Sequence, residues 1–284
     1  MRIAVHQMNS GIETEHNCIA MLGGIAEAKA GGASIYLAPE MSVLIDRDRA
    51  RSAQSIVAEE SSAAVKMLCQ AAKDKQIWVH CGSLPLESAD GRRANRSLLI
   101  DDNGHIVARY DKMHLFDVDL STGESWRESS AYKGGDGPVL ADTPLGKMGL
   151  TICYDMRFPD LYSRLAQAGA TVFAVPAAFT VPTGKAHWHV LLRARAIESA
   201  AFVIAPAQCG KHEDGRETYG RSLVVDPWGT VLLDMGESEG VGFADLDLSR
   251  VAEVRAQIPV HLNRRDIPPL PSPACAPDIV RAMQ

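Results

Sequence analysis

The sequence lacks cysteine pairs at the spacing of a metal site or a redox motif. The chain has 284 residues and six cysteines, yet no two of them form a C-x-x-C motif. Neither a zinc ribbon nor a thioredoxin-type redox motif is therefore indicated. Scattered cysteines in a chain of this length are typical of reduced thiols, which favours a cytoplasmic protein in which most cysteines are structural. The six positions are Cys18, Cys69, Cys81, Cys153, Cys209 and Cys275.

An excess of basic residues and long apolar runs are also missing. The formal net charge is −6, and lysine and arginine do not gather in any one stretch. Nucleic acid and anionic membranes are therefore not expected as partners. No apolar run is long enough to cross a bilayer, and the pattern after Met1 is that of a strand rather than a signal peptide. The content of 46% hydrophobic residues is sufficient for a sizeable globular core.

Nucleotide and metal sites are not indicated by any motif. The sequence has neither a G-x-G-x-x-G nor a Walker A motif, and no serine-hydrolase elbow is predicted. His187 and His189 could suggest a metal pair, but they open a helical pattern, in which residues two apart diverge. Because no further ligand lies nearby, neither a metal nor another cofactor is expected.

The hydrophobic pattern repeats itself. Each half of the chain shows a strand, a helix, a strand, a helix, a strand and a hairpin. The strands are almost continuously apolar, which suits sheets that are covered on both faces. We therefore expect an α/β fold, a four-layer α-β-β-α sandwich built from two pseudo-equivalent halves, with chance similarity of short βα segments as the alternative. The matched segments are 32–39 with 169–176, 77–79 with 202–204, and 96–101 with 221–226.

The repeat draws attention to Glu40. This residue follows Pro39 and a buried strand, whereas Ala177 stands at the corresponding position of the second half. A residue required by the fold would be expected in both halves, so a carboxylate in only one half indicates a site residue. Ligands of α/β sheets bind at the carboxyl ends of strands, where Glu40 is expected.

Cys153 lies where an apolar strand pattern gives way to a helix that begins at Pro159. Such a cysteine is well placed to be a nucleophile, although a buried structural cysteine is the alternative. Taken singly, Lys112 could be a surface charge and Glu40 a turn residue. Together the three supply the thiolate, the proton carrier and the fixed positive charge that cysteine-based amide cleavage requires. A papain-like Cys–His pair stays open, since none of the nine histidines has a local signature.

Several stretches are similar to the nitrilase (carbon–nitrogen hydrolase) superfamily, and most of all to its Nit branch. The similarity extends from residue 1 to about residue 267. It implies an α-β-β-α sandwich, in agreement with the two halves, and a Glu-Lys-Cys triad that needs no metal or organic cofactor. The stretches are Pro39-Glu40-Met41, residues 111–117, residues 149–159, His187-Trp188 with residues 193–198, and residues 219–229.

Carried over by position, the resemblance implies a role for each site residue. Cys153 is the nucleophile, Glu40 the general base and then acid, and Lys112 the oxyanion stabiliser, assisted by the backbone N–H of Tyr154. Glu128 matches a second glutamate, which supports the lysine and the substrate. Attack on the amide leaves a thioester, ammonia departs with a proton from Glu40, and Glu40 then activates water. Lys112 is also expected to lower the pKa of the thiol.

The expected activity is that of an amidase that converts a small carboxylated amide, such as deaminated glutathione, to an acid and ammonia. Arg157, Phe179 and Thr180 flank the predicted site, and Arg157 is expected to hold a substrate carboxylate unless it pairs with Asp155 or Asp160. An ω-amidase that acts on short α-keto acid amides is the alternative within the family. A non-catalytic binding protein on the same fold is the alternative from another class.

The sequence after residue 240 is expected to be less regular. We place one carbon–nitrogen hydrolase domain at residues 1–267 and a proline-rich C-terminal arm at residues 268–284. The resemblance also implies a homodimer or a higher homo-oligomer. The helix at residues 193–198 and the arm are the expected contacts.

Overall fold

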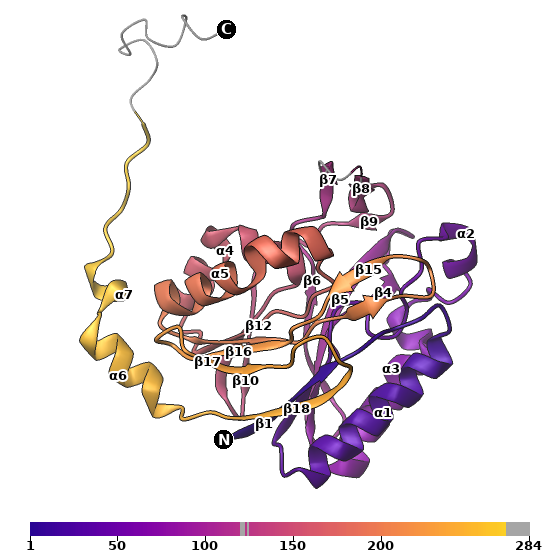
Figure 1. Ribbon diagram of the computed structural model, residues 1–284, viewed down its shortest axis with the longest axis horizontal. Coiled ribbons are helices and arrows are strands. Elements are labelled where there is room, and N and C mark those ends of the chain that lie inside the picture. Colours follow the sequence, from indigo (N-terminus) through magenta and orange to yellow (C-terminus); the bar gives the residue numbers. More distant parts are fainter. Residues whose placement is uncertain (120–122, 124, 271–284) are drawn as a thin grey trace, which may run out of the picture.

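Two mixed β-sheets with matching strand orders form the centre of the molecule (Figure 1). The computed structural model describes residues 1–119, 123 and 125–270. The order is β18-β1-β2-β3-β5-β4 in the first sheet, where β6 and β9 also pair with β5, and β10-β11-β12-β13-β16-β17 in the second. The strands of the first sheet are β1 (Arg2–Gln7), β2 (Ile35–Leu37), β3 (Trp78–His80), β4 (Leu84–Glu87), β5 (Arg93–Ile100), β6 (Ile106–Asp111), β9 (Tyr132–Lys133) and β18 (Gly240–Asp245). Those of the second are β10 (Val139–Thr143), β11 (Gly146–Leu150), β12 (Val172–Ala174), β13 (Phe202–Ala205), β16 (Leu223–Val225) and β17 (Val231–Asp234).

The predicted repeat of the two halves is confirmed. Strands β1, β2 and β3 are parallel neighbours, as are β11, β12 and β13, and each set continues into an antiparallel strand, β5 or β16. The last strand, β18, pairs antiparallel with β1 as β10 pairs with β11. The chain thus returns at its C-terminal end to complete the sheet of its first half.

One predicted register is wrong by a residue. Ile35 pairs with Trp78 in the first sheet and Val172 pairs with Phe202 in the second, so Trp78, not Ile77, corresponds to Phe202. From the third strand to the next antiparallel strand, the second half is one residue longer than the first. The offset that aligns the later strands of the two halves therefore does not align their third strands. Because side chains alternate along a strand, a one-residue error assigns each side chain to the opposite face.

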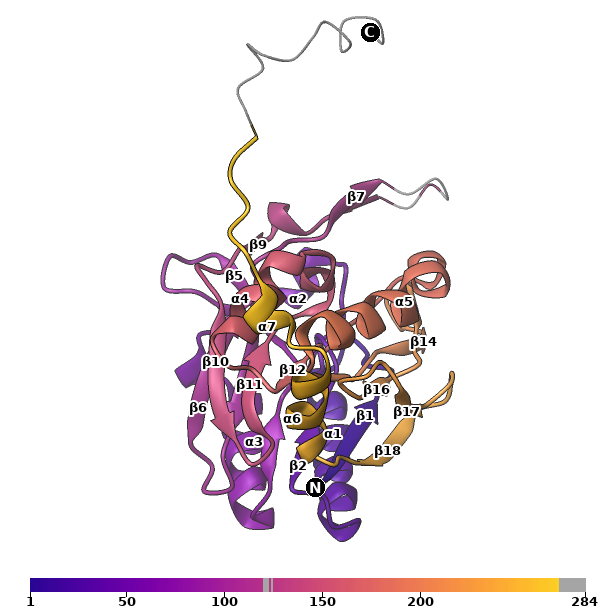
Figure 2. The same ribbon diagram turned by 90° about the vertical axis from the view of Figure 1, so that its left-hand side faces the viewer.

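Helices cover the outer face of each sheet, which confirms the predicted four layers. Ile3 and Val5 join a core cluster that includes residues of the second sheet, whereas Ala4 packs in the cluster under the helices of the first half. Figures 1 and 2 show one helix pair on each side of the two sheets. The pairs are α1 (Thr14–Ala30) with α3 (Ala63–Lys75), and α4 (Pro159–Gln167) with α5 (Val181–Ser199).

Two stretches are more regular than predicted. After residue 240 the chain forms β18, α6 and α7, because β18 finds a partner in β1 that only the folded chain provides. The sequence also predicts an irregular segment at residues 113–138, and the described part of this segment contains the short β7-β8 ribbon and a 3-10 turn. The elements not yet named are α2 (Arg49–Ser52), η1 (Glu59–Ser61), β7 (Asp117–Asp119), β8 (Ser125–Arg127), η2 (Glu128–Ser130), η3 (Cys153–Arg157), β14 (Cys209–Lys211), β15 (Glu217–Tyr219), α6 (Ser249–Gln257) and α7 (Val260–Asn263).

The predicted C-terminal arm is described only in part. Residues 264–270 are exposed, form no helix or strand, and lead away from the body in Figure 2. Residues 271–284 lie outside the described residues, so the domain boundary near residue 267 stays a prediction. In the described part of the chain, no helix combines the length and the apolar character that a membrane span requires.

Candidate active site

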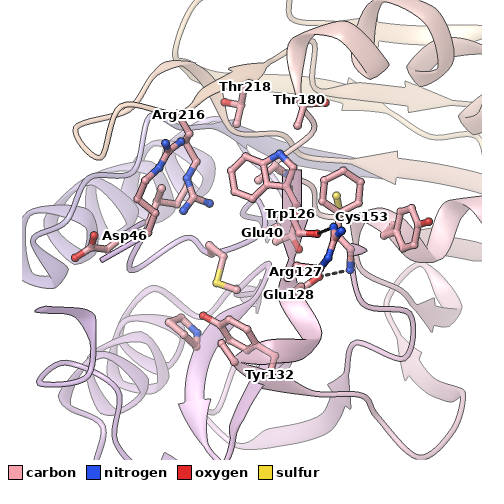
Figure 3. Close-up of a pocket in the computed structure, with 18 of the residues that line it drawn as sticks. Glu40, Asp46, Trp126, Arg127, Glu128, Tyr132, Cys153, Thr180, Arg216 and Thr218 are labelled. Atoms are coloured by element: carbon pink, nitrogen blue, oxygen red, sulfur yellow. Dashed lines mark hydrogen bonds between the residues drawn. The ribbon is translucent and has the colours of Figure 1, made fainter. Parts of the chain in front are cut away.

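Glu40, Lys112 and Cys153 come from different parts of the chain and line one cavity of about 800 Å³. Glu40 lies in the turn after β2, Lys112 directly follows β6, and Cys153 opens the η3 turn after β11. Their exposed fractions are only 4%, 2% and 7%. Figure 3 shows Glu40 and Cys153 close together with Glu128, while Asp46 and Arg216 lie on the far side of the cavity. The packing of the two sheets therefore brings the three predicted residues to one place.

The backbone of Cys153 adopts a left-handed conformation, with φ of +48°. This costs roughly 1–2 kcal/mol for a residue with a side chain, and such strain is common at functional positions. The N–H of Cys153 donates to the carbonyl of Pro176 at 2.9 Å, which fixes the turn. A 3-10 turn follows, and α4 begins at Pro159, as the sequence predicts. Among the described residues, no acceptor takes the N–H of Tyr154.

Lys112 lies between two carboxylates. Its ammonium nitrogen is 2.8 Å from Oε1 of Glu40 and 2.9 Å from Oε2 of Glu128. Burial alone would lower the pKa of Lys112, but the charges of Glu128 and Glu40 outweigh it and raise the pKa well above its usual value. The lysine is therefore a fixed positive charge beside Cys153. This contact places Glu128 where the resemblance implied.

Two further groups orient Glu40, and the sequence did not reveal them. The amide of Asn95 donates to Glu40 Oε1 at 2.9 Å and to Glu128 Oε1 at 3.2 Å. The backbone N–H of Ala178 donates to Glu40 Oε2 at 2.9 Å. The sequence predicts that this strand begins at residue 96, whereas β5 begins at Arg93. With the earlier start, Asn95 shares a face of the strand with Leu99, which packs toward the second sheet. A backbone donor such as that of Ala178 has no signal in a sequence.

Asp155 joins the lysine segment to the cysteine turn. This fully buried carboxylate accepts hydrogen bonds from the hydroxyl of Tyr110 at 2.7 Å, from the backbone N–H of Ile152 at 2.8 Å, and from the backbone N–H of His114 at 3.0 Å. Its oxygens are thereby occupied. The alternative that Arg157 pairs with Asp155 is wrong, since no contact between them lies within 4.0 Å. The same holds for Arg157 and Asp160, both of which the structure describes.

The thiol of Cys153 is not the thiolate that we expected. Burial raises its pKa well above the usual value, and the charge of Glu40 and a hydrogen bond to Glu40 add to this effect. Lys112 lowers the pKa as predicted, but it does not outweigh these three causes. Burial would also raise the pKa of Glu40, yet Lys112 and hydrogen bonds hold that pKa below its usual value. At neutral pH the resting pair is therefore a thiol beside an ionised carboxylate.

The predicted substrate residues are not all in the cavity. Phe179 and Thr180 line it, as does Tyr154. Arg157 is not among the described residues that line it. Its guanidinium carbon lies 5.8 Å from the ring centre of Tyr154 and 5.3 Å from that of Phe179, and both its terminal nitrogens are 3.3 Å from Nδ1 of His187. Arg157 thus lies behind two rings of the cavity wall.

The described residues of the cavity support neither a catalytic histidine nor a serine nucleophile. No histidine is among the described residues that line the cavity, so the papain-like pair lacks a partner for Cys153. His187 and His189 lie on α5 as predicted, and no group of three potential metal ligands occurs within the described residues. Residues 236–240 do match the letters G-x-S-x-G, although no elbow is predicted there. Ser238 stands between strands β17 and β18, however, and not between a strand and a helix.

Known proteins resemble this chain over most of its length. The sequence profile described as Carbon-nitrogen hydrolase matches residues 2–256. The chain belongs to this family. The deaminated glutathione amidase of Dictyostelium discoideum is 45% identical to this hydrolase over 199 residues, 68% of each chain. The NitFhit protein of C. elegans superposes on it with a TM-score of 0.86 at 36% identity, over 93% of this chain and 65% of that chain.

These comparisons confirm the predicted likeness to the Nit branch, and they support a hydrolase that acts on amides. An amidase from Nesterenkonia sp. has a TM-score of 0.76 at 28% identity over 93% of this chain and 99% of that chain. Its structure is described as showing Michael addition of acrylamide at the active site cysteine. The roles of the individual residues in the present hydrolase stay predictions.

The substitution Glu40→Gln is expected to lower both the amide turnover and the pKa of the Cys153 thiol. Amide turnover should fall by on the order of 10²–10⁴, because the base is lost. The pKa of Cys153 should fall too, because the carboxylate that raises it is gone while Lys112 stays. The measurement is the pH dependence of iodoacetamide alkylation of the Cys153 peptide, with Cys153→Ala as the background for the other thiols. A midpoint that stays in place or moves to higher pH contradicts this account.

Proposed function

We propose that this protein is an amidase that cleaves deaminated glutathione through a thioester on Cys153. The observation that carries the proposal is the Lys112 ammonium held by Glu40 and Glu128, at 2.8 and 2.9 Å, in the cavity that contains the thiol. The name of the Dictyostelium relative suggests the substrate. A cavity of about 800 Å³ has room for a long amide of this kind.

The first chemical step forms the thioester. Because the thiol is neutral at rest, Glu40 takes its proton as the sulfur attacks the amide carbon. The oxygen of the tetrahedral intermediate receives hydrogen bonds from Lys112 and from the N–H of Tyr154. Glu40 then gives the proton to the amide nitrogen, the carbon–nitrogen bond breaks, and the amine leaves.

The second step hydrolyses the thioester. Glu40, again ionised, takes a proton from a water molecule that attacks the thioester carbon. The carbon–sulfur bond breaks, and the proton returns from Glu40 to the sulfur of Cys153. Asn95 and the N–H of Ala178 keep the Glu40 carboxylate in one orientation through both steps. The acid product then departs.

The leaving group depends on the substrate and differs from our first expectation. Deaminated glutathione is a secondary amide whose nitrogen belongs to cysteinylglycine, so its cleavage yields 2-oxoglutarate and that dipeptide. Ammonia is released only from a primary amide such as α-ketoglutaramate. An assay for 2-oxoglutarate therefore detects both activities, whereas an assay for ammonia detects only the second.

We also propose that Arg157, Phe179 and Thr180 contribute to the side of the cavity next to Cys153. Phe179 and Thr180 offer a ring and a hydroxyl to the acyl part of the substrate. Arg157, behind the rings of Tyr154 and Phe179, supplies positive charge toward the substrate carboxylate. If Arg157 acts in this way, Arg157→Gln raises KM for 2-oxo acid amides more than for amides without the carboxylate.

The direct experiment compares deaminated glutathione and α-ketoglutaramate side by side. Wild-type protein should cleave the first with the higher kcat/KM, and Cys153→Ala should cleave neither while it stays folded. Lys112→Ala should lose at least about 10²–10³ in kcat, as when an oxyanion donor is removed. Circular dichroism checks the fold of both variants. A clear preference for α-ketoglutaramate would identify an ω-amidase, and binding of both compounds without turnover would identify a binding protein.

A homodimer through α5 is a further part of the proposal. Val190 and Ile197 of this helix are 68% and 49% exposed, and Trp228 and Leu232 of the adjoining hairpin are 46% and 41% exposed. Such a group of exposed apolar side chains is typical of an interface. Val190→Asp should therefore shift the protein toward monomer in sedimentation experiments, and an unchanged mass would contradict the proposal. The five described cysteines are free, in keeping with the cytoplasmic location that we propose.

A further inference from the structure

Arginines are unusually frequent in the wall of the active-site cavity, and three of the five face carboxylates. Nε of Arg216 lies 2.8 Å from Oδ2 of Asp214, and Nε of Arg47 lies 3.8 Å from the same oxygen. Arg127 donates to both oxygens of Asp119, at 2.9 and 2.7 Å. Each of these three guanidinium groups therefore has a carboxylate partner within the protein, and Arg216 and Arg47 share theirs.

The other two cavity arginines, Arg49 and Arg93, have only neutral partners. Arg93 donates to the hydroxyl of Ser52 at 3.2 Å and to the backbone carbonyl of Arg49 at 2.9 Å. A guanidinium has five N–H bonds, so three of those on Arg93 have no protein acceptor among the described residues. Arg49 donates only to the carbonyl and hydroxyl of Ser130. Neither arginine has a carboxylate within 4.0 Å in the described part of the chain.

Tyr132 connects this pair of arginines with the catalytic residues. It is paired with Arg93 where β9 meets β5, and it lines the same cavity. Burial raises the pKa of Tyr132 to about 12, the charge of Glu128 adds to this, and Arg93 opposes it. Tyr132 thus lies within electrostatic reach of both Glu128 and Arg93. A ligand that extends from the catalytic centre along Tyr132 reaches the uncompensated positive charge.

The direction of the amine part of the substrate follows from the proposed function. Glu40 delivers the proton to the departing nitrogen, so this nitrogen lies on the Glu40 side of the reacting carbon. Glu40, Arg49 and Arg93 all belong to the first half of the chain, in the β2 turn, α2 and β5. The acyl part instead stays beside Cys153 and Tyr154 of the second half. The chain beyond the departing nitrogen therefore extends toward Arg49 and Arg93.

We propose that Arg49 and Arg93 form a subsite for a carboxylate at the far end of the leaving amine. The inference rests on the proposed function and refines it. Arginine binds carboxylates through paired, charge-assisted hydrogen bonds, and two guanidinium groups without carboxylate partners in one cavity wall fit such an anion. The subsite selects long amides with a terminal carboxylate over primary amides, which have nothing to place there.

The test uses three amides with the same 2-oxoglutaryl acyl group. Their leaving groups are cysteinylglycine, cysteinylglycine amide and ammonia, and each reaction is followed by 2-oxoglutarate. Arg93→Gln should lower kcat/KM about 10- to 100-fold for the first compound and less than about 3-fold for the other two. The preference of wild-type protein for the carboxylate over the carboxamide should disappear in this variant. That preference is a ratio within one protein sample, so partial loss of folded enzyme does not change it.

Arg92→Gln is the matched control. Arg92 precedes Arg93, but its side chain is 61% exposed and pairs with Asp90 outside the cavity. This variant should keep the wild-type preference. An equal loss for all three amides in Arg93→Gln, or an unchanged preference, overturns the subsite while the amidase proposal stands. If wild-type protein cleaves none of the three amides, the proposed function itself fails, and the subsite fails with it.

Discussion

The site depends on one buried ion cluster, in which the Lys112 ammonium lies between the carboxylates of Glu40 and Glu128. A charge removed from water costs several kcal/mol unless it is paired and hydrogen-bonded. The two carboxylates beside Lys112 therefore stabilise its charge at 2% exposure, the charge of Glu128 more strongly than that of Glu40. In the proposed mechanism the same cluster sets the chemistry, since Glu40 helps to raise the thiol pKa and Lys112 would offer a cation to an oxyanion.

The two-half architecture explains how such a cluster can be built. The first half contributes Glu40, Lys112 and the amide of Asn95, and the second half contributes Cys153 and the N–H of Ala178. These groups stand at strand ends of two sheets that share a core, so their positions are fixed by packing. The cavity that they share also reaches Arg49 and Arg93 in the first half. In the proposed scheme, catalysis and the choice of leaving amine therefore use different parts of one cavity.

The fold and the main site residues could be predicted because their signals are local or repeated. The spacing of hydrophobic residues and the internal repeat predicted the α-β-β-α sandwich. The presence of Glu40 where the second half has Ala177 singled out a site residue. The raised thiol pKa could not be predicted, since it results from burial and from Glu40, which is remote in sequence. The position of Arg157 behind two rings was hidden for the same reason, because ring packing depends on the tertiary fold.

The central claim is that every amide passes through one thioester on Cys153. The most direct measurement is the partition of that thioester between water and added hydroxylamine, for two amides that share an acyl group but differ in the leaving amine. A common thioester predicts the same ratio of hydroxamate to acid from deaminated glutathione and from α-ketoglutaramate. A ratio that depends on the leaving amine, or acid alone from both compounds, would contradict the thioester and would indicate direct attack by water.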